Sequence, residues 1–160
     1  MRVLISGGGI AGLTLAYWLH LYAIPAVVIE QAKALRRDGY AIDFLGTSYE
    51  VAERMTLIDR LAAQQVPFEG LVYVNKDGKP ISKLDAALIR TITDGKYMGL
   101  MHSTLEEALY EALAGQVEVR FGRWINAIEP GPDAVVVTFN DGTTESFDLL
   151  VTSFLCFCQN

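Results

Sequence analysis

The 160-residue sequence has few of the residues that build metal sites and disulfide frameworks. It contains only two histidines, His20 and His102, and only two cysteines, Cys156 and Cys158. One residue separates the cysteines, which is too close for an ordinary loop-closing disulfide, and neither histidine is spaced to complete a zinc site. We therefore expect no bound metal and two reduced thiols, as in a cytoplasmic protein.

A surplus of positive charge is also missing, because 13 Lys and Arg residues stand against 19 Asp and Glu residues and the net charge is -6. Proteins that bind nucleic acid neutralise its phosphates with a concentrated basic surface, so a nucleic-acid partner is not expected. Within residues 1–37, however, four basic residues outnumber the single acidic one, Glu30. This segment is therefore the favoured place for a small anionic ligand.

No charged residue occurs between Val3 and Ile29, which raises the alternative of a signal peptide or a membrane span. Four glycines within Gly7 to Gly12 and a proline, Pro25, interrupt this run. Glycine and proline both disfavour a continuous apolar helix. The run instead predicts a strand, a glycine turn, a helix and a second strand, and we expect no membrane partner.

This opening segment has the pattern of a dinucleotide-binding βαβ unit. We predict a buried strand over Arg2–Ser6, a helix from Ile10 to about Tyr22, and a second strand over Ala26–Glu30. Short, uninterrupted apolar strands are typical of a parallel sheet that is covered on both faces. The start of the helix, at Ile10 and Ala11, would present backbone N–H groups and the positive end of the helix dipole to phosphates.

The glycines have the G-x-G-x-x-G spacing of a pyrophosphate-binding turn, at Gly7, Gly9 and Gly12. Gly7 permits a tight turn after the strand, Gly9 leaves room for the pyrophosphate, and Gly12 lets the helix lie close to the sheet. Glu30 ends the next strand, where its carboxylate can accept hydrogen bonds from an adenosine ribose. The motif and its context therefore predict dinucleotide binding.

The middle of the chain suggests a second lobe. A strand is expected over Tyr40–Leu45, and a helix is expected over Ser48–Ala63 with a break near Thr56. From Phe68 to Ile92 the residues alternate around Asp77-Gly78, which is a strong hairpin signal.

The last third of the chain returns to helix and strand. A helix is predicted over Ser103–Ala114, with Ser103 and Glu106 as an S-x-x-E capping box. A short strand, "VEVRFG", a meander that turns at residues 140–142 and a last apolar strand follow. Strand-borne aromatic residues usually pack, so Trp124 and Phe139 are expected in the core rather than against a ligand.

Four segments, "VLISGGGIAGLTLAYWLH", "LRRDGYAIDFLG", "LEEALYEAL" and "FDLLV", occur in this order. Together they resemble the FAD-dependent monooxygenases of the aromatic hydroxylase type, which include the tetracycline-inactivating oxygenases. The resemblance covers residues 2–151 and implies an α/β fold, with a Rossmann-like βαβ FAD-binding fold, an added antiparallel β meander and part of a second β-sheet lobe. It also implies FAD as cofactor, NAD(P)H as external reductant, and oxygen insertion from O2 into an aromatic or polycyclic small molecule.

The resemblance implies cofactor contacts position by position. The glycine loop would hold the pyrophosphate and Glu30 the ribose, and one of Arg36 and Arg37 matches an arginine that the family places near the flavin. From the residues alone, these two arginines either reach the cofactor or form an exposed basic turn. Gln31 stands where the family often has arginine. His102 stands where an arginine commonly contacts phosphate, so its imidazole either replaces that contact or only packs beside the helix.

After "FDLLV" the family continues with a Gly-Ala-Asp-Gly segment and later a Gly-Asp motif, whereas this sequence reads "TSFLCFCQN". We therefore expect residues 1–160 to form an incomplete FAD-binding domain, with residues 66–99 as an inserted piece of the substrate-lobe sheet, truncated and inactive alone. The alternatives are a non-catalytic adenine-dinucleotide-binding module completed by a partner chain and, less favoured, an NAD-linked dehydrogenase. The apolar terminus, with Phe154, Leu155 and Phe157, predicts self-association.

Overall fold

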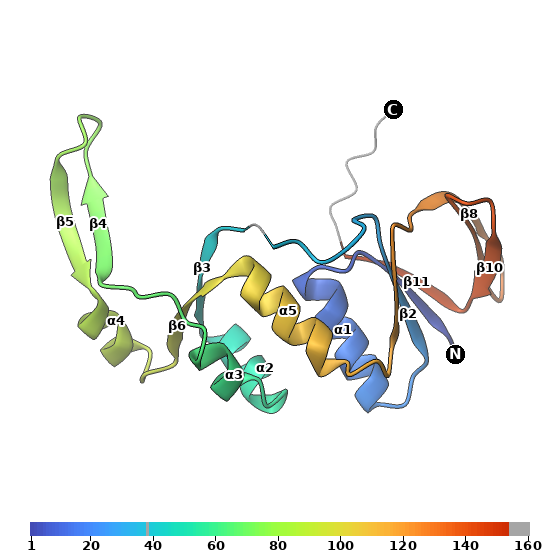
Figure 1. The fold of residues 1–160 in the computed structure, drawn as a ribbon, viewed down its shortest axis with the longest axis horizontal. Helices are drawn as coiled ribbons and strands as arrows, with labels where there is room; N and C mark the ends of the chain where they lie inside the picture. The colour runs from blue at the N-terminus through green and yellow to red at the C-terminus, as the bar shows by residue number, and fades with distance from the viewer. Residues whose placement is uncertain (38, 154–160) are drawn as a thin grey trace. The chain divides into compact units, whose positions relative to one another are not determined.

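The computed structural model describes residues 1–37 and 39–153, which fall into two compact units. The first unit consists of Met1–Arg37 with Glu106–Asn160, and the second consists of Asp38–Leu105 (Figure 1). The two cysteines and the apolar terminus predicted to self-associate lie outside the described residues. Within the described ranges, no helix is both long enough and apolar enough to cross a membrane.

Four parallel strands form the sheet of the first unit, in the order β11-β1-β2-β7. The first strand is buried at all four positions, as its apolar sequence predicts. Strands β2 and β11 flank β1 on opposite sides, and such a change of direction marks where open α/β sheets bind ligands at their carboxyl ends. The strands are β1 (Val3–Ser6), β2 (Ala26–Glu30), β7 (Glu118–Phe121) and β11 (Leu149–Thr152).

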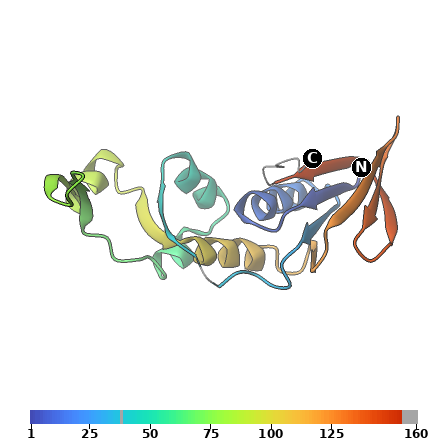
Figure 2. The same ribbon diagram turned by 90° about the horizontal axis from the view of Figure 1, so that it is seen from above.

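Helix α1 (Ile10–Leu21) connects β1 to β2 and packs on one face of this sheet (Figure 2). Two glycines allow the helix to lie close to the sheet. A Cβ atom on Gly12 would lie 1.9 Å from the carbonyl oxygen of Gly7, so only glycine fits there. Gly7 has a φ of 116°, which few other residues adopt. The predicted strand, glycine turn, helix and strand are therefore confirmed.

An antiparallel meander covers the other face of the sheet, so that α1 and the meander lie on opposite sides of it (Figures 1 and 2). Its strands are β8 (Ile125–Pro130), β9 (Val135–Phe139) and β10 (Thr144–Phe147), in the order β10-β9-β8. One apolar cluster joins the two sheets, namely Leu4, Val27, Ile29, Val137, Phe139 and Phe147. The predicted meander and the buried position of Phe139 are confirmed.

An ion-pair network ties the two sheets together beside this core. Glu145 of β10 accepts hydrogen bonds from Arg2, at 2.8 Å, and from Arg120 of β7. Arg120 also pairs with Glu118 at 2.9 Å. The hydrogen bond from Arg120, followed by that from Arg2, holds the pKa of Glu145 below its usual value because both cations favour the ionised carboxylate.

The second unit contains an antiparallel strand pair and two short helices. Strand β3 (Ala41–Leu45) pairs with strand β6 (Tyr97–Met101). Strand β3 was predicted from the sequence and strand β6 was not. The helices are α2 (Thr47–Arg54) and α3 (Ile58–Ala62). Thr56, between them, has a positive φ of 57°, so the predicted break in this helix is confirmed.

The predicted hairpin is also present in the second unit, with β4 (Gly70–Val74) paired to β5 (Pro80–Asp85) and Gly78 at a φ of 76° in the turn. The predicted alternating segment extends to Ile92, but its second strand ends at Asp85. Asp85 accepts a hydrogen bond from the N–H of Ala87 at 3.0 Å and so begins helix α4 (Ala86–Ile92).

Helix α5 (His102–Ala112) begins in the second unit and ends in the first. It begins one residue before the predicted range, so Ser103 is not the N-cap and the predicted capping box is wrong. The N–H of His102 donates to the carbonyl of Tyr40 at 3.0 Å and ends the β6 pairing there. Ser103 therefore lies inside the first turn. Glu106 lies on the buried side of the helix, with 7% of its surface exposed.

Candidate functional site

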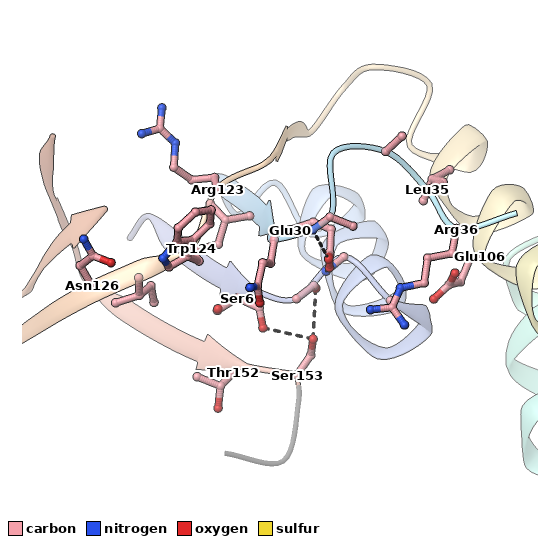
Figure 3. Close-up of a pocket in the computed structure, with 18 of the residues that line it drawn as sticks. Ser6, Glu30, Leu35, Arg36, Glu106, Arg123, Trp124, Asn126, Thr152 and Ser153 are labelled. Carbon is pink, nitrogen blue, oxygen red and sulfur yellow. Dashed lines mark hydrogen bonds between the residues drawn. The ribbon is translucent and has the colours of Figure 1, made fainter. Parts of the chain in front are cut away.

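A cavity of about 730 Å³ opens at the carboxyl ends of the parallel strands in the first unit (Figure 3). Its walls are the glycine loop, the end of β2 with the residues that follow it, the segment from Arg123 to Ile128, and the end of β11. All of these segments belong to the first unit. The cavity therefore occupies the edge of the sheet where α/β folds bind nucleotides.

The glycine loop forms the floor of the cavity. Gly9 precedes α1 in an extended conformation and makes no side-chain cap, and the first turn of α1 contains no acidic residue. The first N–H groups of the helix therefore have no capping side chain from their own segment, and the positive end of the helix dipole favours an anion there. Ile10 and Ala11 form this first turn and do not line the cavity wall.

Glu30 stands at the centre of the cavity, where β2 ends. One carboxylate oxygen accepts a hydrogen bond from the N–H of Gly8 and the other from the N–H of Ala32, both at 2.8 Å. These bonds hold the carboxylate in one orientation. Because each carboxylate oxygen has two lone pairs, Glu30 can still accept further hydrogen bonds from a ligand hydroxyl.

The other residues that the sequence predicts to contact the cofactor are divided between the two units. Gln31 and Arg36 line the cavity, whereas Arg37 does not. His102 belongs to the second unit, where its ring lies 5.2 Å from the ring of Tyr40. The structure thus brings the glycine loop, Glu30, Gln31 and Arg36 together in one cavity of the first unit.

Several residues of the cavity were not predicted from the sequence. Ser153, directly after β11, donates its hydroxyl to the carbonyls of Ser6 and Gly7, at 3.2 and 3.1 Å (Figure 3). This ties the end of β11 to the start of the glycine loop. No local motif predicts such a contact, because β1 and β11 are separated in the sequence by almost the whole chain.

The segment after β7 forms the opposite end of the cavity from Arg36 (Figure 3). Trp124 lies in it with 44% of its surface exposed, so the expected core position of Trp124 is wrong. The indole lies outside the core because the chain crosses from the parallel sheet to the meander at this point. Arg123 pairs with Asp141, and the hydrogen bond from Thr143, followed by that from Arg123, lowers the pKa of Asp141.

One further side chain reaches the hollow above Gly9. A Cβ atom on Gly9 would lie 3.3 Å from a carboxylate oxygen of Glu106, and among the described residues no other nearby atom outside the loop lies within 4 Å. Apart from this carboxylate, the residues fit the adenosine diphosphate half of a dinucleotide, with a glycine floor and helix N–H groups for phosphates and Glu30 for a ribose. No group of three or more potential metal ligands occurs in the described residues.

Comparisons with known proteins agree with this geometry. The sequence model of a family described as FAD binding domain matches residues 1–158. The FAD-dependent monooxygenase asL4 of Sarocladium schorii is 30% identical, in a match that covers 94% of this chain and 36% of that protein. A flavin-dependent monooxygenase from an unknown prokaryotic organism is 28% identical over 96% of this chain and 39% of its own length.

Solved structures show the same fold. The tetracycline destructase Tet(51) matches 95% of this chain and 38% of its own, with a TM-score of 0.76 and 26% identity. The chain thus spans between about a third and two fifths of the length of the relatives it matches. The predicted resemblance, α/β fold and cofactor are confirmed: the chain belongs to the FAD binding domain family, whose cofactor is FAD, and corresponds to the N-terminal FAD-binding part of flavin-dependent monooxygenases.

Proposed function

We propose that this chain holds the adenosine diphosphate half of FAD in the cavity of the first unit, as part of an NAD(P)H-linked monooxygenase that hydroxylates an aromatic or polycyclic small molecule. The observation that carries the proposal is the meeting of Gly7, Gly9, Glu30 and Arg36 at the carboxyl ends of the parallel strands. We also propose that the protein works in the cytoplasm, where NAD(P)H is available and two cysteines stay reduced.

Each part of the nucleotide has a matching group in the cavity. The glycine floor and the N–H groups of α1 would bind the pyrophosphate, and the guanidinium of Arg36 would supply a positive charge to it. Glu30 would accept hydrogen bonds from the adenosine ribose, and its negative charge would disfavour a 2′-phosphate. Trp124 presents an exposed aromatic surface on which an adenine can stack.

The protein and the cofactor would have different roles in the reaction. FAD, when bound, supplies the redox and oxygen chemistry, and the residues described here supply binding and orientation. The hairpin β4–β5 and the start of strand β6 lie within residues 66–99, which we propose to be part of the substrate lobe. The substrate would therefore be bound by the second unit together with segments that the longer relatives possess.

Binding of ADP and FAD to the purified chain tests this proposal. We expect ADP to bind measurably by isothermal titration calorimetry and FAD fluorescence to be quenched on binding. Gly9→Ala should weaken ADP binding by about tenfold or more, because a methyl group fills the space that a phosphate needs, and tenfold corresponds to about 1.4 kcal/mol.

Gly39→Ala is the matched control. A Cβ atom at Gly39 would also have its nearest neighbour at 3.3 Å, the N atom of Ser103, but Gly39 belongs to the second unit and is not part of the cavity. ADP affinity should therefore stay at the wild-type value. Equal weakening by both substitutions, or a folded wild-type chain that binds neither ADP nor FAD, would overturn the proposed site.

A further inference from the structure

Among the residues that the structure describes, Glu106 is the only buried residue with a charged side chain. It lies in α5 and lines the cavity of the first unit, and the next residue, Glu107, is exposed on the same helix. Glu106 therefore places a carboxylate in the wall of the cavity, whereas Glu107 does not line it.

The carboxylate of Glu106 faces the start of α1. Its Oε1 atom lies 3.3 Å from where a Cβ atom of Gly9 would be, and both residues line the cavity. Figure 3 shows Glu106 and Arg36 at the same end of the cavity. The positive end of the α1 dipole favours a negative charge at this place, whether a carboxylate or a phosphate carries it.

We infer that Glu106 is an internal anion that occupies the phosphate position of the glycine loop and lowers the affinity of this chain for dinucleotides. A bound pyrophosphate and the Glu106 carboxylate would need the same space above Gly9. Two anions at contact distance in a partly buried site repel each other strongly, so the side chain must turn away before a phosphate can enter. This inference rests on the proposed function of the cavity as a nucleotide site.

The test compares Glu106→Gln with Glu107→Gln, which remove the same charge from neighbouring positions of one helix. ADP and adenosine are the probes, measured by isothermal titration calorimetry on the full chain. Glu106→Gln should bind ADP about tenfold more tightly than wild type, which corresponds to about 1.4 kcal/mol. Glu107→Gln should change ADP binding less than about twofold, since solvent and salt screen an exposed charge.

Adenosine, which has no phosphate, should bind both variants and wild type equally. Glu106→Ala is a second variant of the same position and should also bind ADP more tightly than wild type. It takes the place of Glu106→Gln if that variant does not fold. If wild type binds ADP and neither Glu106 variant binds it more tightly, the inference is wrong and the nucleotide site stands. If wild type and all variants fold but none binds ADP, the proposed function itself is wrong.

Discussion

The strands of the two units are similar in apolar character and very different in burial. In the first unit, β1 is buried at every position, between α1 and the meander. In the second unit, four of the five residues of β4 are exposed, and Val72 and Tyr73 keep 52% and 56% of their surface exposed. Apolar sequence therefore predicts that a strand forms, whereas burial depends on which layers pack on it. A two-stranded hairpin alone is only marginally stable in water.

The largest expected effect tests the close packing of the first unit. Gly12→Ala would place a methyl group 1.9 Å from the carbonyl oxygen of Gly7, so α1 must move away from the sheet. We expect a loss of about 3 kcal/mol in the free energy of unfolding, which urea denaturation followed by circular dichroism would measure.

Gly99→Ala is the control in the second unit, because its Cβ atom would lie 3.2 Å from the carbonyl oxygen of Val66 and a small shift can relieve the contact. A loss of about 1 kcal/mol or less is expected. If α1 did not lie so close to the sheet, Gly12→Ala would stabilise the protein, because alanine favours a helix over glycine by about 1 kcal/mol. A Gly12→Ala variant that is more stable than wild type would therefore contradict the close packing.

A second comparison uses one residue type in two strands. Val28 of β2 is fully buried and Val72 of β4 is half exposed. Val28→Ala should cost about 2 kcal/mol, since it leaves a cavity between packed layers. Val72→Ala should stay within about 0.5 kcal/mol of wild type. Equal losses in denaturant titrations would mean that β4 is buried in solution as deeply as β2.

The ion-pair network of the first unit should have a smaller, pH-dependent effect. Glu145→Gln should cost about 1 kcal/mol at pH 7, because the pairs with Arg2 and Arg120 are partly exposed. The pKa of Glu145 is lower in the folded chain than its ordinary value of 4.5. Its contribution is therefore present above that value and is lost as the pH falls through the lower, folded pKa.

Urea denaturation of wild type and Glu145→Gln at pH 7 and at acidic pH measures this dependence. The stability difference between the two proteins should shrink as the pH decreases below 4.5. Glu129→Gln, at an exposed position of the meander, is the control and should differ little from wild type at either pH. A difference that stays constant with pH would contradict the assigned network.

The smallest effect is expected at the hydrogen bond of the Tyr97 hydroxyl group in the second unit. Tyr97 donates to a carboxylate oxygen of Asp43 at 2.6 Å. Burial, followed by the bond to Asp43, raises the pKa of Tyr97 well above its ordinary value of 10.0. Tyr97→Phe should cost about 0.5 kcal/mol, because Asp43 is exposed and water can replace the bond.

Because the pKa is raised, the stabilisation by Tyr97 is present below pH 10.0 and is lost as the pH rises through the folded pKa. Ultraviolet titration of the seven tyrosines should show one that ionises last. Tyr97→Phe should remove that step and leave the others unchanged. Loss of an early step instead would show that Tyr97 is not the protected tyrosine.

Much of the first unit could be predicted because its signals are local. The glycine spacing, the flanking apolar strands and Glu30 lie within thirty residues, and their backbone geometry follows from steric rules. The Asp77-Gly78 turn and the break near Thr56 were predictable for the same reason. Strand β6 was not predicted, because its pairing with β3 depends on a partner more than fifty residues away.

The sequence by itself determined the βαβ unit, its glycine turn, the carboxylate at the end of β2 and the family, because these depend on backbone freedom and on short-range periodicity. Only the tertiary structure decided that Arg36 rather than Arg37 lines the cavity, that Trp124 also lines it, and that Glu106 reaches the hollow above Gly9. The physical reason is packing: side chains that are distant in the sequence meet only after α1, α5 and the meander have docked on the sheet.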